Sequence, residues 1–199
     1  MADYWILGLK APTNIEKKVT ELQTSLYREW ELASALSLPV MIPISFLPPG
    51  PASQRPAALR SALRGVVGTQ TLYFRSASII EIEGSLFWDL EPREQLQRLA
   101  AKCAKGFPRG DSQQEPLFPV GRGFYLGSVE GRSGSGITSI PTPEPLSFPA
   151  RAAVLIRVHP LVGDIQETDH GTEQDRAATQ MWWQSLFWEE LARLPLRKG

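Results

Sequence analysis

A short apolar run followed by an amphipathic helix pattern occurs twice in this chain of 199 residues. The first copy joins residues 4–10 to a pattern over 13–30, and the second joins residues 85–90 to a pattern over 92–107. In both patterns the apolar residues recur at helical spacing, as do Ile15, Val19, Leu22 and Leu26 in the first and Leu96, Leu99, Ala100 and Cys103 in the second. Another apolar run follows each helix, at 38–47 and at 122–129. This order predicts an α+β fold with two pseudo-repeated strand-helix-strand lobes, antiparallel or mixed sheets around a central cleft, and helices on the outside.

The remaining segments fit the same single domain. We expect a helix over residues 55–68, one or two antiparallel strands over 71–84 and a last strand over 151–160. The lobes are predicted at roughly 1–70 and 71–160, with an aromatic C-terminal extension over 161–199. Within it, the spacing of Trp183, Phe187, Leu191 and Leu194 favours a helix over residues 181–196, although the density of aromatic residues would also suit a strand.

Charge and cysteine content exclude several classes of function. Lysine plus arginine equals aspartate plus glutamate at 21 each, so no net charge attracts the chain to nucleic acid. Cys103 is the one cysteine, which rules out an internal disulfide and predicts a buried packing residue. No apolar run is long enough to span a bilayer, and we expect a cytoplasmic protein without a cofactor or metal.

The apolar run 38–47 contains a proline at its centre. Pro43 cannot donate a hydrogen bond to a neighbouring strand, so its place predicts a bulge, a sheet edge or interrupted pairing. The run is too short for a helix, and a strand remains the best interpretation.

The order of elements, with "MIPISFL" at 41–47 and "RGFYLG" at 122–127, resembles the 2H phosphoesterase superfamily of bacterial 2′-5′ RNA ligase-like proteins and cyclic phosphodiesterases. The resemblance implies two strands that face each other across a cleft, each with a His-x-Thr/Ser motif. In that family one histidine is the general base and the other the general acid, and the hydroxyl groups hold phosphate oxygens.

This chain departs from both motifs. The resemblance places Met41 and Pro43 at the first histidine and hydroxyl positions, and Arg122 and Phe124 at the second; a register on residues 151–156 would instead place Arg151 and Ala153 there. A methionine transfers no proton, and an arginine stays protonated. The expectation is therefore a degenerate active site without catalytic residues.

Three functions remain open. The cleft could bind an anion such as a nucleotide or an RNA end through arginines on or beside predicted strands: Arg75, Arg122, Arg151 and Arg157. Alternatively, Met41, Pro43 and Phe124 plug the cleft, and the chain contacts a protein partner through Trp182, Trp183 and Trp188. A third interpretation is a hydrolase that uses His159 or His170.

Two loops fail tests for a ligand site. His170 stands in an acidic loop with Asp164, Glu167, Asp169 and Glu173, whose spacing matches no calcium-binding loop. The glycine-rich stretch 127–139 follows a strand, but no Lys-Ser/Thr pair and no helix follow it, as a phosphate-binding loop requires. Both stretches are expected to be ordinary loops.

Overall fold

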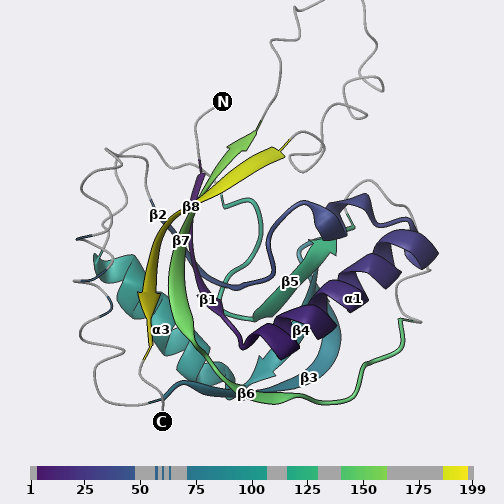
Figure 1. Cartoon of the computed structure of the whole chain (residues 1–199), viewed down its shortest axis with the longest axis horizontal. Helices are drawn as coiled ribbons and strands as arrows, with labels where there is room; N and C mark the ends of the chain where they lie inside the picture. The colour runs from purple at the N-terminus through teal and green to yellow at the C-terminus, as the bar shows by residue number, and fades with distance from the viewer. Residues whose placement is uncertain are drawn as a thin grey trace, which may run out of the picture.

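The computed structural model contains two four-stranded antiparallel sheets (Figure 1). It describes residues 4–47, 57, 60, 63, 71–106, 116–129, 140–160 and 186–196. In the first sheet the strand order is β2-β1-β7-β8, formed by Ile42–Leu47, Tyr4–Lys10, Ala152–Pro160 and Leu186–Pro195. In the second it is β5-β4-β3-β6, formed by Gly123–Ser128, Ser85–Glu91, Tyr73–Ile82 and Ser147–Pro149. The predicted α+β class and the expected strands at 4–10, 85–90 and 151–160 are confirmed.

The hairpin between β3 and β4 shows how local sequence sets a turn. Glu83 and Gly84 both have positive φ angles, of 48° and 69°. Two consecutive left-handed residues are typical of the tight turns that match the twist of paired strands, and glycine adopts that conformation without steric cost. The predicted segment 71–84 therefore supplies one long strand and the turn after it.

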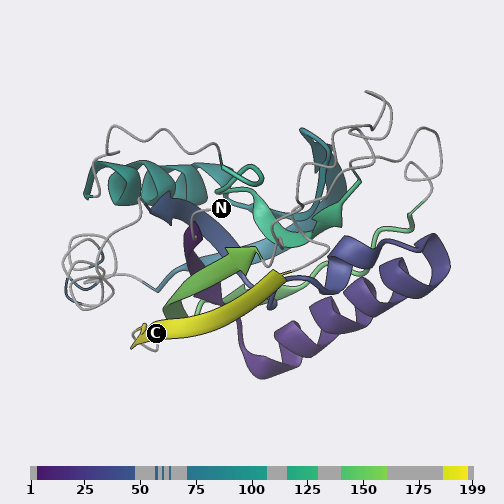
Figure 2. The same ribbon diagram turned by 90° about the horizontal axis from the view of Figure 1, so that it is seen from above.

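Each helix packs against the sheet that does not contain the strand before it. Helix α1, Thr13–Trp30, follows β1 but lies against β5, where the Gln23 side chain donates to the Tyr125 carbonyl at 3.1 Å. Helix α3, Arg93–Gly106, follows β4 but lies against β2. A short 3₁₀ helix, η1 (Ala33–Leu36), continues from α1. Figure 2 shows α1 and α3 on opposite sides of the strands. Each half of the chain therefore contributes a helix that packs on the sheet of the other half.

The helix expected over 181–196 is wrong for its described part, because residues 186–195 form the strand β8. Strand β8 pairs with β7 along its whole length, and the register shifts by one residue between Leu155 and Ile156. The shift leaves Leu191 as an extra residue, which gives apolar side chains an uneven spacing that imitates a helix. Tertiary pairing with β7 decides the outcome where local periodicity is ambiguous.

Buried apolar residues form two clusters. The larger one lies under the helices and includes Cys103, whose burial raises the pKa of its thiol to about 11 and confirms the predicted packing role. The second, which we call the inter-sheet cluster, draws its members from β1 and β7 of the first sheet, from β4 and β5 of the second and from two loops: Ile6, Leu38, Met41, Phe87, Phe118, Tyr125, Val154, Ile156 and Val158. The inter-sheet cluster therefore joins the inner faces of the two sheets. Residues 57, 60 and 63 of the expected helix 55–68 are helical.

Candidate functional site

The strand that follows Met41 and contains Pro43 lies at a sheet edge. Strand β2 is the outer strand of the first sheet, and its register with β1 shifts where Pro43 comes opposite Gly8. The prediction from Pro43 is confirmed, because an edge strand can lack one amide donor. The Pro43 carbonyl still accepts a hydrogen bond from the Gly121 amide at 2.9 Å, which links β2 to the residues that lead into β5.

Met41 is buried beside this edge. Its side chain is 2% exposed and belongs to the inter-sheet cluster. The chain is packed so closely over β1 that a Cβ atom on Gly8 would come within 2.8 Å of the Met41 sulfur. The position where the resemblance implies a histidine therefore holds a thioether in a closed apolar environment.

Phe124, expected at the second hydroxyl position, faces away from Met41. Its ring lies in the larger cluster, 6.5 Å from the ring of Trp88 and 5.4 Å from that of Phe148. The next residue, Tyr125, is the one that enters the inter-sheet cluster. Arg122 is half-buried, and its carbonyl accepts from the Leu90 amide at 3.2 Å. Alternation along β5 puts Gly123 on the same side as Tyr125.

Five aromatic rings cross from one sheet to the other. Tyr4 lies 6.2 Å from Phe46, and Phe46 lies 5.1 Å from Phe118. Phe118 stacks on Tyr125 at 4.5 Å, and Tyr125 lies 5.9 Å from Phe87. These distances are those of favourable aromatic pairs, which add about 0.5 to 1.5 kcal/mol each beyond the area that they bury. We call these five residues the aromatic ladder; it fills space between β2 and β5.

A buried carboxylate, missed from the sequence, lies beside β5. Asp89 is fully buried in β4, opposite Gly123, and its Oδ2 accepts from Nε of Arg93 at 2.9 Å and from Nη2. Its Oδ1 has no hydrogen-bond partner among the described residues. The hydrogen bond and the charge of Asp89 raise the pKa of Arg93, so this guanidinium stays protonated. An aspartate four residues before an arginine at a predicted helix start was the available signal.

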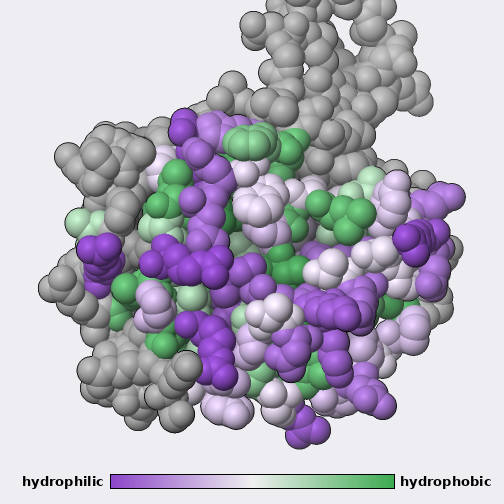
Figure 3. All heavy atoms as spheres, in the orientation of Figure 1, coloured by the Kyte–Doolittle hydropathy of each residue, from purple (hydrophilic) through white to green (hydrophobic). Residues whose placement is uncertain are grey.

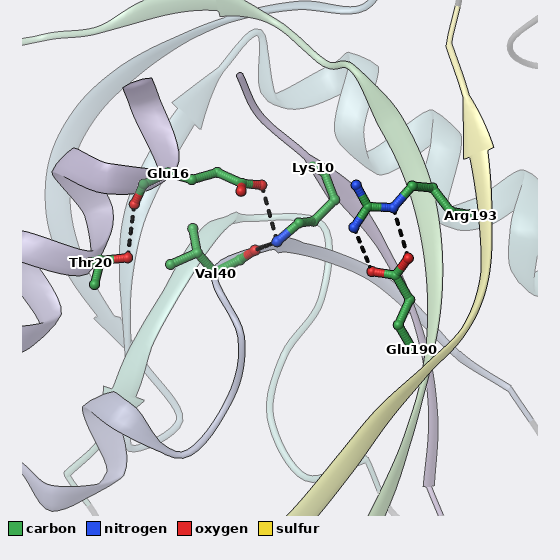
Figure 4. A network of polar contacts seen from close by, with 6 residues as sticks. All are labelled: Lys10, Glu16, Thr20, Val40, Glu190 and Arg193. Atoms are coloured by element: carbon green, nitrogen blue, oxygen red, sulfur yellow. Dashed lines mark hydrogen bonds and ion pairs between the residues drawn. The ribbon is translucent and has the colours of Figure 1, made fainter. Parts of the chain in front are cut away.

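A second polar network includes the carbonyl of Val40, the residue before Met41 in the chain (Figure 4). The Lys10 ammonium donates to the Val40 carbonyl at 2.6 Å and pairs with Glu16 at 3.0 Å. On β8, both Arg193 nitrogens Nε and Nη2 bond Glu190 at 2.7 Å. The charge of Lys10 helps to lower the pKa of Glu190, after the larger effect of the Arg193 hydrogen bond. Both cations thus already have carboxylate partners.

The four arginines considered for anion binding lie on or beside three strands, β3, β5 and β7, of the two sheets. Arg157 is on the side of β7 opposite the inter-sheet cluster, where it pairs with Glu189 at 3.3 Å and lies 5.8 Å from the centre of the Trp5 ring. Arg75 is exposed on β3, opposite Glu91, and Arg151 is exposed just before β7. Of the four, Arg122 is the one next to the Gly121–Pro43 hydrogen bond that links β2 to the residues before β5.

His159 shares the outer side of β7 with Arg157. Its Nε2 lies 3.6 Å from Glu189, and its ring lies 6.0 Å from that of Phe187. His170, the acidic loop, Trp182, Trp183 and residues 130–139 of the glycine-rich stretch fall outside the described residues. Within the described ranges, no group of three or more His, Cys, Asp or Glu side chains could hold a metal ion. No helix in that part of the chain is long and apolar enough to cross a membrane.

Several solved structures have the same arrangement of elements as this chain. E. coli LigT complexed with NADP+ matches with a TM-score of 0.61 and 12% identity over 98% of each chain. TT0787 of Thermus thermophilus matches with a TM-score of 0.59 and 15% identity, also over 98% of each chain. A structure described as a phosphoesterase matches with a TM-score of 0.54 and 14% identity, over 99% of this chain and 100% of the other. No family model and no curated protein matches the sequence.

Proposed function

We propose that this chain, whose elements are arranged as in LigT, TT0787 and a phosphoesterase, is a 2′-5′ RNA ligase-like protein of the 2H phosphoesterase superfamily that has lost phosphodiesterase catalysis. The observation that carries the proposal is the buried thioether of Met41 at the first motif position. General acid and base catalysis needs a group that gains and loses a proton near the working pH, as an imidazole does. Met41 and Pro43 supply no such group, and Phe124 packs on the other side of β5.

The packing around the motif strands supports the same conclusion. A cyclic phosphate needs a polar, hydrated space between the two motifs, whereas the aromatic ladder and Met41 occupy space between the sheets with apolar atoms. Burying a phosphate against such a surface would remove its hydration without replacing the lost hydrogen bonds. Tyr125 and Phe87, rather than the expected Phe124, act together with Met41 as the filling side chains.

Incubation with 2′,3′-cyclic nucleotides tests the loss of catalysis. We expect no turnover above that of buffer, by product chromatography, for the wild-type protein and for His159→Ala alike. Turnover that copurifies with the chain and survives in His159→Ala would contradict the proposal. Turnover that disappears in His159→Ala would instead establish the hydrolase alternative at the outer side of β7.

Binding of a nucleotide is a second candidate function. E. coli LigT has been solved with NADP+, with 3′-AMP, with ATP and with phosphate. In this chain the half-buried Arg122 lies next to the link between the two motif strands, and a guanidinium can bind a phosphate with two hydrogen bonds without any catalysis.

A thermal-shift titration tests nucleotide binding. A nucleotide at a hundred times its dissociation constant would stabilise the native state by about 2.7 kcal/mol. We expect ATP or 3′-AMP to raise Tm of the wild type and to raise it less in Arg122→Ala. Arg28→Ala, which removes an exposed arginine of α1, is the matched control and should keep the full shift. An unchanged Tm with both nucleotides would rule out this ligand class and leave the loss of catalysis standing.

A non-catalytic protein-interaction module remains the alternative to a nucleotide binder. The plugged space between the sheets is compatible with it, and the described part of the aromatic C-terminal segment presents Trp188 at 39% exposure and Phe187 at 54%. Exposed aromatic residues are enriched where proteins associate.

A further inference from the structure

Three of the four sheet edges in the described structure are protected. The edge strands β2 and β5 come together through the Gly121–Pro43 hydrogen bond. Strand β5 is also covered by η1, because the Ser128 amide donates to Ser34 Oγ at 2.7 Å. Strand β6 has three residues and ends in Pro149. Short strands, prolines and covering segments are the usual means by which proteins prevent unwanted strand pairing.

The fourth edge, β8, is the least protected within the described part of the chain, although it too ends in a proline and contains a bulge. It is ten residues long, contains no lysine, and has its proline at the last position. Its inner edge pairs with β7, and no described strand pairs with its outer edge. An edge of this length offers a row of backbone donors and acceptors to another strand.

The bulge in β8 places two opposite charges on one face. The partners of Val158, Ile156, Val154 and Ala152 are Trp188, Glu190, Arg193 and Pro195. Because alternate residues of β7 share a face, these four residues of β8 also share one. Glu190 and Arg193 form their ion pair on that face, with Arg193 54% exposed. Hydrophilic and hydrophobic side chains both lie along the course of β8 on the surface of the molecule (Figure 3).

We propose that β8 pairs antiparallel with β8 of a second copy of this chain. A two-fold axis between Leu191 and Ala192 would set Glu190 opposite Arg193 of the partner subunit, and Trp188 opposite Pro195 of the partner subunit. Both pairs occur twice, since the axis repeats every contact. The two ion pairs become a ring of four alternating charges, and each half-exposed Trp188 ring gains an apolar neighbour. The two first sheets become one continuous sheet of eight strands.

The side chains on this face of β8 favour a second copy of the chain over an unrelated strand, because their order along β8 is complementary to itself. In the proposed register, residues that face each other lie on the same side of the joined sheet, and no like charges meet. A one-residue slip would move Glu190 to the opposite face from the partner's Arg193. The pairing depends on β8 alone and stands apart from the catalytic and nucleotide-binding proposals.

Charge reversal in two separate variants tests the pairing. Sedimentation velocity over a concentration series should show a dimer for the wild type. Glu190→Arg makes both positions positive, and Arg193→Glu makes both negative, so each variant alone should dimerise about tenfold more weakly or worse. An equimolar mixture of the two should regain the dimer, because every opposed pair is then attractive. A variant that had merely unfolded could not be rescued in this way.

Glu81→Arg, a charge reversal at an exposed position of β3, is the matched control and should remain as dimeric as the wild type. A wild type that stays monomeric up to its solubility limit would overturn the proposal. So would two charge variants that dimerise as well as the wild type, or a mixture that stays monomeric. The proposal would be established if the wild type and the control are dimers, each charge variant alone is a monomer, and the mixture of the two variants is a dimer.

Discussion

Replacing Gly123 by alanine is expected to lower the free energy of unfolding by about 3 kcal/mol, the upper part of the usual range for overpacking. The added Cβ atom would overlap the carbonyl oxygen of Trp88 and approach the Cα atom of Asp89 within 3.0 Å. Both are backbone atoms of β4, which is held between β3 and β5 and cannot move aside without breaking two sets of strand pairs. Urea denaturation followed by tryptophan fluorescence measures the loss.

Gly8→Ala is the control for this substitution. Its Cβ would also meet an atom at short range, but that atom is the flexible sulfur end of Met41, 2.8 Å away. A side chain can rotate where a backbone cannot, so the cost should be about 1 kcal/mol. Equal losses for the two variants would show that β4 and β5 yield more easily than their pairing indicates.

Phe124→Ala is expected to cost about 4 kcal/mol, because removing a fully buried phenylalanine loses its burial and leaves a cavity. The cavity would open beside Trp88 and Phe148, under α1, and the inter-sheet cluster would keep its packing. Thermal and urea denaturation measure the loss. Tyr73→Ala, at a side chain that is 58% exposed, should change stability by less than about 0.5 kcal/mol.

Phe124→Ala also distinguishes two possible roles of Phe124, as a plug of a ligand site and as part of the core under the helices. If Phe124 plugged a ligand site, truncating it would cost little stability and would open space between the sheets for a nucleotide. Packing in the helix-side core instead predicts a large loss of stability with no new affinity for ATP. A small loss accompanied by ATP binding would refute the assignment of Phe124 to that core.

The sequence was sufficient for elements with a clear period or a clear chemical constraint. The helical spacing from Ile15 to Leu26 and from Leu96 to Cys103 predicted α1 and α3, which bury those residues. Pro43 predicted an irregular or edge strand, because a missing amide restricts where a strand can lie. The strand expected over residues 38–47 covers only Ile42–Leu47, so Met41 lies just before it, and the structure adds its burial.

Two features could not be read from the sequence, for different physical reasons. All six residues of β5 are buried, so no polar alternation shows which side faces the other sheet, and Phe124 was assigned the side that Tyr125 has. In β8 no residue from 186 to 195 is buried and one residue bulges, so the apolar spacing fitted a helix. Only the long-range pairing with β7 resolves that ambiguity. The spacing of Asp89 and Arg93 could have predicted their ion pair, but nothing in the sequence shows that Asp89 is buried.

The first sheet is built from strands that lie far apart in the sequence, which affects how this chain folds during synthesis. Strands β3, β4, β5 and β6 are consecutive along the chain, so the second sheet can assemble once residue 149 has left the ribosome. Strand β1, made first, pairs on one side with β7, whose residues are made some 150 positions later. Until then the apolar β1 segment has no partner on that side and depends on β2 or on a chaperone for cover. Contacts so distant in sequence also slow folding, which makes the first sheet the step that completes the molecule.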